Sequence, residues 1–319
     1  MLPLPTDLVE RTDRPAYRPF RATVAGVTPL AEHFVRVTFT GPDFDVFGTD
    51  ALDQRIKLLF PLPGIGMSDI GADDPAAIDE GSWFTRWRDL PDAARNPLRT
   101  YTVRAVRPEH RELDVDFVAH GIGGPAAAWL ATATAGDELV IVGPDARSIN
   151  SAAGIDWHPG IASEYLLAGD ETAAPAICSI LESLPEGTSA AAFIEVPSVA
   201  DALPIESRAN VTVSWLGRGD AAVGSRLDEA VRDWVAGHPS LVEAARSSVP
   251  QQLDDVDVDT ETLWDSPEAV ASGEFYAWIA GESAMVKAVR RFLVTETGID
   301  RRRVAFMGYW RLGKAEAQE

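Results

Sequence analysis

The sequence has little cysteine, no paired histidines and no long apolar run, and each absence excludes a class of protein. One thiol, Cys178, can form no internal disulfide and cannot ligate an iron–sulfur cluster. The five histidines are scattered without an HxH or HxxxH spacing, so we expect no dedicated metal site. The chain also lacks the run of roughly 20 apolar residues that a membrane-spanning helix requires.

Positive charge is scarce as well. The 28 lysines and arginines face 49 aspartates and glutamates, which gives a net charge of −21. Such a chain repels nucleic acid and anionic membrane surfaces, so we expect neither as a partner. Residues 1–15 lack the basic start and apolar stretch of a signal peptide, and we expect a cytoplasmic protein that is a monomer.

The first half of the chain has the period of β-strands. Between Phe20 and Pro144, short β-branched runs are separated by Gly, Pro and Asp turns. Alternation at this spacing is typical of an antiparallel barrel or sandwich. We expect helices within 125–133 and 82–91. The acidic segments 68–82 and 252–269 are expected to be solvated loops or insertions.

The second half alternates strands with helices, which predicts a parallel sheet with right-handed crossovers. We therefore expect one domain over 16–147, a linker over 148–162 and a second domain over 163–313. The acidic stretch 243–273 has the composition of an insertion, and the sequence assigns it no function.

Two segments of the first half combine residues that suit a flavin nucleotide. In LDVDFVAHGIGGPAAAWL (113–130) a strand is followed by a glycine turn and a helix, an arrangement that favours a diphosphate but is equally often only a turn. In RTYTVR (99–104) the alternation places Arg99, Tyr101 and Val103 on one face and Thr100, Thr102 and Arg104 on the other. One face could stack a flat ring and neutralise a phosphate, although an ordinary edge strand has the same pattern.

The second half has its own strand-to-helix corners. LLAGDETAAPAI (166–177) places a turn at the carboxyl end of a predicted parallel strand, where nucleotides bind. Gly281 and Glu282 form another such corner. Tyr309 and Trp310 are adjacent aromatics in the last strand, and a buried core pair is the usual explanation for them.

Together, RTYTVR, DFVAHGIGGPAAAWL, GDETAAPAI, AWIAGE and GYWRLG resemble, in this order, the siderophore-interacting protein family of ferric-siderophore reductases. That family belongs to the ferredoxin-reductase-like flavoenzymes. The resemblance implies an N-terminal antiparallel six-stranded FAD-binding barrel followed by a parallel-sheet NAD(P)H-binding α/β domain. It also implies FAD and either NADH or NADPH as cofactors, and a ferric siderophore as substrate.

The resemblance further implies roles by position. We expect cofactor contacts from residues of all the motifs: Arg99, Thr100, Tyr101, Thr102, Val103, Asp116, Val118, His120, Gly123, Gly124, Ala126, Trp129, Asp170, Glu171, Thr172, Ala173, Gly281, Glu282, Tyr309 and Trp310. Three cations are expected to receive the anionic ferric siderophore: Lys57, Arg147 and Arg311. Lys57 is the clearest of them because it interrupts an otherwise apolar strand.

No general acid or base is required for electron transfer, so we expect no catalytic residue. Glu195 at a strand end favours NADH, whereas Ser198 and Arg218 would favour the phosphate of NADPH, and the choice stays open. A ferredoxin is a further possible electron donor. Two other functions remain: a flavodoxin- or ferredoxin-type reductase with a protein partner, and a ferric-siderophore binding module without catalysis.

Overall fold

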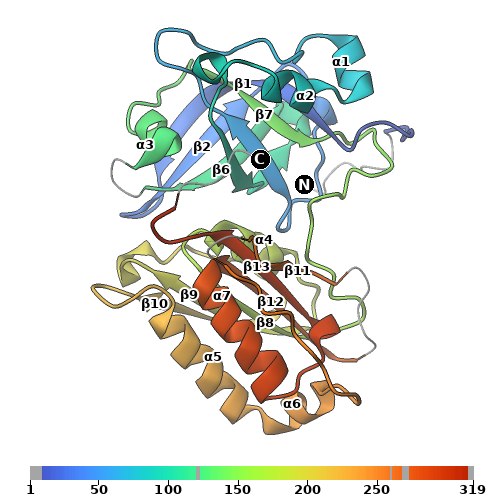
Figure 1. Ribbon diagram of the computed structural model, residues 1–319, viewed down its shortest axis with the longest axis vertical. Helices are drawn as coiled ribbons and strands as arrows, with labels where there is room; N and C mark the ends of the chain where they lie inside the picture. Colours follow the sequence, from blue (N-terminus) through green and yellow to red (C-terminus); the bar gives the residue numbers. More distant parts are fainter. Residues whose placement is uncertain (1–8, 120–122, 259–260, 268–272, 315–319) are drawn as a thin grey trace. The chain divides into compact units, whose positions relative to one another are not determined.

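The computed structural model describes residues 9–119, 123–258, 261–267 and 273–314. They divide into two compact units (Figure 1). The first unit holds the chain up to Leu30 together with Phe34–Ile155, and the second holds the chain from Asp156 onward together with Ala31–His33. Within the described ranges, no helix is both long enough and apolar enough to cross a membrane.

A seven-stranded antiparallel sheet frames the described part of the first unit. Its strands lie in the order β4-β3-β7-β1-β2-β6-β5. Their bounds are β1 (Tyr17–Pro29), β2 (Phe34–Thr40), β3 (Arg55–Leu59), β4 (Leu98–Thr102), β5 (Ala105–Arg107), β6 (Glu112–Val118) and β7 (Glu138–Pro144). The helices that accompany the sheet are α1 (Pro75–Glu80), α2 (Trp83–Arg88) and α3 (Gly124–Leu130).

This sheet curls because one segment supplies both of its edges. β4 lies at one edge beside β3, and β5 lies at the other edge beside β6. Between them the N–H of Val103 donates to the carbonyl of Gln54 (3.0 Å), and the N–H of Arg104 donates to the carbonyl of Asp114 (3.0 Å). The described part of this sheet therefore has seven strands, whereas six were expected, because the first half of RTYTVRAVR pairs with β3 and the second half pairs with β6.

Alternate side chains of the strands build the core of the first unit. In β6, Leu113, Val115 and Phe117 belong to one apolar cluster. Asp114 and Asp116 point to the opposite face, as the period of a strand requires. The apolar pattern of the sequence thus fixes which face of the sheet is the core.

The acidic segment 68–82 is partly packed against this unit, so it is not a solvated loop, and the alternative of an insertion stays a prediction. Asp74 caps α1, Pro75 occupies its first turn, and Gly81 ends it in the left-handed conformation (φ 68°). Ile70 and Trp87 are buried in a second apolar cluster. The few apolar residues between the acids are enough to hold the segment against the sheet.

The described part of the second unit is built on a six-stranded sheet in the order β10-β9-β8-β12-β13-β11. Its strands are β8 (Glu164–Asp170), β9 (Ser189–Val196), β10 (Asn210–Gly217), β11 (Trp264–Asp265), β12 (Phe275–Glu282) and β13 (Val304–Trp310). The first five strands in the spatial order are parallel, but β11 is antiparallel to β13. The sheet is therefore mixed rather than wholly parallel, because a strand of two residues shows no period in the sequence.

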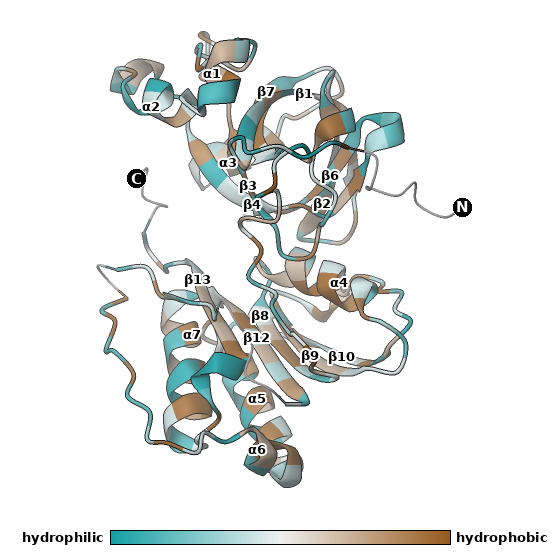
Figure 2. Ribbon diagram, turned by 90° about the vertical axis from the view of Figure 1, so that its right-hand side faces the viewer, coloured by the Kyte–Doolittle hydropathy of each residue, from teal (hydrophilic) through white to brown (hydrophobic). Residues whose placement is uncertain are grey.

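Helices cover both faces of the second sheet. Figure 2 shows α4 on one side and α5 and α7 on the other. Phe275, Ala277 and Ile279 of β12 pack in the cluster that includes α5 and α7. The helices are α4 (Ala174–Ser183), α5 (Ser225–Gly237), α6 (Pro239–Ala245) and α7 (Ser283–Arg290), and α7 continues as a π-helical stretch (Arg291–Glu296).

Part of the acidic stretch 243–273 is held by basic side chains of α7. Lys287 Nζ donates to the carbonyl of Val256 (2.7 Å), and Arg290 Nη2 donates to Asp265 Oδ2 (2.7 Å). Leu263 is buried in the apolar cluster of this unit. These residues are therefore not a solvated loop, and the expectation of an insertion stays a prediction.

Candidate functional site

The predicted flavin strand, β4, has two different faces. On one face the ring of Tyr101 lies against that of Phe117, with centroids 4.4 Å apart. On the other, Lys57 of β3 is paired with Thr100, and its Nζ donates to the Thr100 hydroxyl (2.5 Å). Arg99 is half-buried and donates to the preceding carbonyl (2.8 Å). The other two predicted residues of this segment are buried: Thr102 and Val103.

Asp116 of β6 is buried between arginines. Its carboxylate accepts two hydrogen bonds from Arg36 (2.7 and 2.9 Å), and Arg104 Nε lies 3.5 Å from Oδ2. The carboxylate of Asp116 is therefore bonded within the first unit, where it holds Arg36 and Arg104 in place. Its contact with FAD stays a prediction, as does that of Val118 at the end of β6. His120 lies outside the described residues.

The glycine turn before α3 leaves its backbone open to a ligand. Gly124 has φ +85°, a conformation that favours glycine, and a Cβ at Gly123 or Gly124 would meet no atom of the described residues within 4 Å. Ala126 is half-buried in the first turn of α3. Trp129 packs on Phe60, with ring centroids 5.4 Å apart. The open glycines fit the diphosphate of FAD, whereas Trp129 packs against the apolar cluster of this unit.

The two arginines predicted to receive the substrate differ in their surroundings. Arg147 forms two hydrogen bonds to Asp145 (2.9 and 2.7 Å), and this carboxylate raises the pKa of the guanidinium. The charge of Arg147 is thus largely compensated. Arg311 follows β13 directly and is half-buried.

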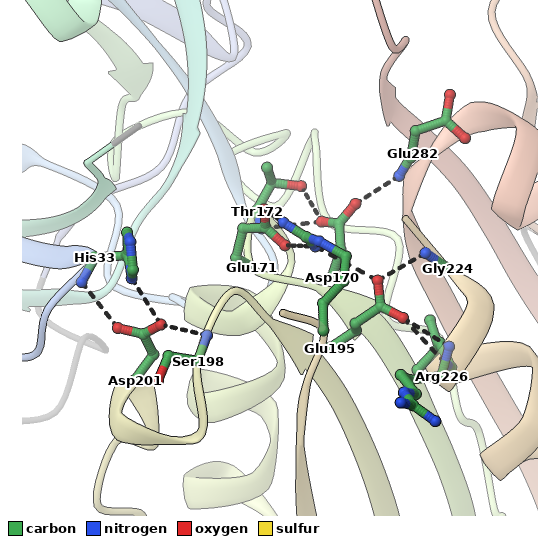
Figure 3. A network of polar contacts seen from close by, with 12 residues as sticks. His33, Asp170, Glu171, Thr172, Glu195, Ser198, Asp201, Gly224, Arg226 and Glu282 are labelled. Atoms are coloured by element: carbon green, nitrogen blue, oxygen red, sulfur yellow. Dashed lines mark hydrogen bonds and ion pairs between the residues drawn. The ribbon is translucent and has the colours of Figure 1, made fainter. Parts of the chain in front are cut away.

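In the second unit, several predicted residues meet where the strand order reverses. β9 and β10 follow β8 on one side, and β12 and β13 lie on its other side, so the switch point is between β8 and β12. Ligands of such sheets bind outside the carboxyl ends of the strands at this point. Asp170 ends β8, and its Oδ2 accepts the N–H of Glu282 (2.7 Å) and the indole N–H of Trp310 (2.7 Å). Its Oδ1 accepts the N–H (2.9 Å) and the hydroxyl (2.5 Å) of Thr172. Figure 3 shows Thr172 and Glu282 on either side of Asp170.

Two glycines make this close approach possible. A Cβ on Gly281, which has φ +142°, would lie 2.6 Å from Asp170 Oδ2. A Cβ on Gly169 would lie 2.5 Å from the Cβ of Ala173 and 2.7 Å from the carbonyl of Ala280. Gly281 was predicted as a cofactor contact, and the structure shows that it makes room for the carboxylate.

The surroundings of Asp170 favour its neutral form. Burial raises the pKa of its carboxyl to about 6, and the nearby charge of Glu171 adds to the rise. The hydrogen bonds from Thr172, Trp310 and the backbone of Glu282 act in the opposite direction. This carboxyl therefore titrates much nearer to neutral pH than an ordinary aspartate.

Glu171 and Glu195 hold one arginine between them. Arg218 donates to both oxygens of Glu171 at 2.9 Å, and its Nη1 lies 3.4 Å from Glu195 Oε1. Glu195 also accepts the N–H groups of Gly224 (2.7 Å) and Arg226 (3.0 Å) at the start of α5 (Figure 3). The sequence marked both Glu195 and Arg218 as candidates for the nicotinamide cofactor, but it did not reveal that they bind each other.

The remaining predicted residues of this unit have structural partners. Glu282 caps α7 by accepting the N–H groups of Ala284 (2.7 Å) and Met285 (3.0 Å). Tyr309 stacks on Trp264, with ring centroids 5.8 Å apart. Two further residues also have structural roles. Ala173 is buried at the start of α4, and the Ser198 hydroxyl accepts the N–H of Ala200 (3.2 Å).

A cavity of about 400 Å³ opens beside the first turns of α5 and α7. Its walls include Ser225 of α5 and Gly224 just before it, Ala284 and Met285 of α7, and Leu312. The cavity lies at the same edge of the sheet as the start of α7, where Glu282 follows the switch-point strand β12. The phosphates of a dinucleotide would share this edge of the sheet with several carboxylates.

A curled antiparallel sheet followed by an α/β sheet of this strand order is the architecture of the ferredoxin-reductase-like flavoenzymes. The fold matches the ferredoxin reductase in carbazole 1,9a-dioxygenase with a TM-score of 0.54 at 14% identity, covering 92% of this chain and 70% of that one. Residues 23–148 match the family model described as the siderophore-interacting FAD-binding domain, and residues 162–313 match the model described as siderophore-interacting protein. The chain belongs to the siderophore-interacting protein family, as its motifs predicted, and it is an FAD-dependent oxidoreductase.

Individual relatives agree with this assignment. An uncharacterized protein of Mycobacterium tuberculosis is 35% identical over 305 residues, which cover 94% of this chain and 93% of the relative. The ferric vibriobactin reductase ViuB of Vibrio cholerae is 31% identical over 290 residues, covering 90% of this chain and 87% of the relative. The crystal structure of a siderophore utilization protein from T. fusca has a TM-score of 0.67 at 26% identity, covering 97% of this chain and 99% of that one.

Proposed function

We propose that this chain reduces Fe(III) bound to a siderophore, with electrons that pass from NADH or NADPH through FAD, and so releases Fe(II). The match of 31% identity to a ferric vibriobactin reductase over 90% of the chain carries the proposal. We propose that the protein acts as a monomer in the cytoplasm. A ferredoxin is the alternative electron donor.

Bound FAD supplies the conversion between a two-electron donor and one-electron acceptors. One NAD(P)H gives a hydride, and two Fe(III) each take one electron. The balanced products are NAD(P)⁺, two Fe(II) and one proton. Fe(II) binds the hard oxygen donors of siderophores weakly, so reduction releases the metal.

The chain itself binds and orients the reactants, and no acid or base of the protein is needed. In the first unit, the open turn at Gly123 and Gly124 and the half-buried Arg99 would hold the FAD phosphates. Lys57 lies on the adjacent strand, where the Thr100 hydroxyl fixes its ammonium group. A positioned cation on a protein with a net charge of −21 would attract an anionic ferric chelate locally.

Lys57→Ala tests this role. We expect the KM for an anionic ferric siderophore to rise about tenfold with kcat little changed, because a charged contact to the substrate is lost. Fe(II) release would be followed with a coloured ferrous chelator under anaerobic conditions, starting from chemically reduced FAD protein. The matched control is Lys287→Ala, which removes a lysine that is bonded elsewhere, to Val256 and Asp255.

Unchanged kinetics in Lys57→Ala would show that Lys57 does not receive the substrate. A colourless protein that binds ferric siderophores but no FAD would instead overturn the reductase itself. Electron transfer to a redox protein and not to the ferric chelate would identify the alternative reductase class.

A further inference from the structure

The carboxyl ends of three neighbouring strands are linked by one arginine. Arg218 follows β10, and its backbone N–H donates to the carbonyl of Val196 at the end of β9 (2.8 Å). Its guanidinium then bridges to Glu171, just after β8, and to Glu195 in β9. One cation thus spans the strand ends on the β9 side of the switch point.

Sheets of this order use two kinds of residue in this region to choose between NADH and NADPH. An acid at the end of the second strand accepts the ribose hydroxyls of NADH, and a nearby arginine binds the 2′-phosphate of NADPH. Both residue types are present here, as Glu195 and Arg218, but both are already bonded inside the protein.

Both carboxylate oxygens of Glu195 already accept hydrogen bonds inside the protein, so they cannot also accept the hydroxyls of a ribose. Its side chain is fully buried, Oε1 accepts the N–H of Gly224 (2.7 Å), and Oε2 accepts the N–H groups of Arg226 (3.0 Å) and Leu227 (3.2 Å). The residue is therefore a cap for α5. It cannot be the group that favours one dinucleotide over the other.

Arg218 is the residue that a 2′-phosphate could still reach, because 13% of its side chain is exposed. Its partner Glu171 is only 1% exposed and meets it with two parallel bonds of 2.9 Å. A phosphate that captured Arg218 would have to break this buried pair and both of its 2.9 Å bonds, which is costly.

The charges around Arg218 also disfavour a 2′-phosphate. Arg218 contributes one positive charge, whereas Glu171 and Glu195 contribute two negative charges at contact distance. The formal charge of these three side chains is therefore −1, and it opposes the approach of the extra phosphate of NADPH. NADH lacks this phosphate and avoids the repulsion.

We propose that Glu171 is the specificity-determining residue of this site: it withholds Arg218 from a 2′-phosphate and so selects NADH over NADPH. This inference rests on the proposed use of a nicotinamide donor. The sequence left the choice between NADH and NADPH open, and the ion pair of Glu171 with Arg218 decides it in this proposal.

The test measures binding and not turnover. NAD⁺ and NADP⁺ would be titrated calorimetrically into the FAD-loaded protein, and we expect the wild-type protein to bind NAD⁺ more tightly. Glu171→Gln keeps the shape of the side chain and removes its charge. We expect it to raise the affinity for NADP⁺ relative to NAD⁺ by at least about tenfold, because one charge close to Arg218 is removed.

A second variant checks that Arg218 causes the gain. Glu171→Gln combined with Arg218→Gln should lose the improved NADP⁺ affinity. The matched control is Asp265→Asn, which removes the carboxylate from another ion pair of the same unit (Arg290, 2.7 Å) and should leave the ratio unchanged.

Tighter binding of NADP⁺ than NAD⁺ by the wild-type protein would overturn the inference, even if the Glu171 variants did not fold. So would an unchanged ratio in a folded Glu171→Gln variant, or a gain that persists without Arg218. If neither dinucleotide bound, the inference would fall together with the nicotinamide donor. Reduction of a ferric siderophore by chemically reduced FAD protein would still stand as a separate result.

Discussion

At the scale of single residues, Asp170 is a buried carboxyl that the structure surrounds with neutral donors. It accepts bonds from two backbone N–H groups, one hydroxyl and one indole, and the nearby charge of Glu171 has the same sign as its own. Each of these donors is neutral, so they offset only part of the cost of burying a negative charge.

We predict that Asp170 makes the protein less stable as the pH rises from about 4 to about 6. Its pKa in the folded state, about 6, lies above the ordinary 3.8, so the folded form binds the proton more tightly within this window. The contribution of Asp170 to the free energy of unfolding is therefore largest below its unfolded pKa. It falls by about 3 kcal/mol as the carboxyl ionises. Denaturant unfolding at a series of pH values would measure this slope in the wild-type protein and in Asp170→Asn.

The asparagine variant should lose this component of the pH dependence, although its absolute stability should also drop because an amide cannot accept at both ends. Asp300→Asn is the control of opposite sign, since Arg302 lowers the pKa of Asp300 and stabilises its charged form. Identical pH slopes in the wild-type protein and Asp170→Asn would contradict the prediction.

At the scale of elements, the start of α5 depends on a residue from another strand. The N-cap of α5 is Gly224, which has no side chain to bond the first turn. Glu195 of β9 takes this role by accepting three N–H groups at the helix end. Its negative charge also suits the positive end of the helix dipole.

We predict that Glu195→Ala destabilises the protein by about 3 kcal/mol, because several N–H groups and Arg218 lose a buried partner. Hydrogen exchange should become faster at Arg226 and Leu227 in particular. Ser198→Ala is a suitable comparison, since it removes the cap of a short 3-10 turn (Val199–Asp201) and should cost only about 1 kcal/mol. Equal losses in the two variants would argue against a special role for Glu195.

The elements also show what a sequence can predict. The period-two runs and the strand–helix alternation gave the two sheets, because each depends on local apolar spacing. The start of α1 was also visible locally, in Asp74 and Pro75, but its acidic composition led to the prediction of a solvated loop or an insertion. The division between β4 and β5 was not visible, because it depends on which distant strand each half meets.

The candidate site also divides into features that depend on local sequence and features that depend on distant contacts. GDETAAPAI marked the turn at Asp170 because its residue types suit the end of a parallel strand. The inward orientation of Glu195 could not be predicted, since it depends on where the first turn of α5 lies in space. The sequence therefore located the candidate groups, and only the fold revealed which of them are already bonded to each other.

At the scale of the whole molecule, each unit has its own apolar clusters, and the predicted FAD contacts at Gly123 and Gly124 lie in the first unit alone. We predict that removing FAD increases deuterium uptake in β4, β6 and the start of α3, and leaves β8 and β12 unchanged. A ligand stabilises only the folded state that binds it, by about 2.7 kcal/mol at a hundredfold excess over its Kd. Mass spectrometry of the FAD-loaded and stripped protein would measure this, and an equal increase in both units would contradict it.

The pairing of β1 with β7 has a consequence for the synthesis of the protein. Tyr17 pairs with Pro144 and Thr23 pairs with Glu138, so the two halves of the first sheet are joined by its first and last strands in the chain. On the ribosome, β1 must wait for β7 to emerge, which takes several seconds at about 5–20 residues per second. Until then β1 can pair only with β2. The backbone groups on its other edge are unpaired, so they can form wrong pairings within the nascent chain or be bound by chaperones. Once β7 has emerged, the FAD unit can close while most of the second unit is still being translated.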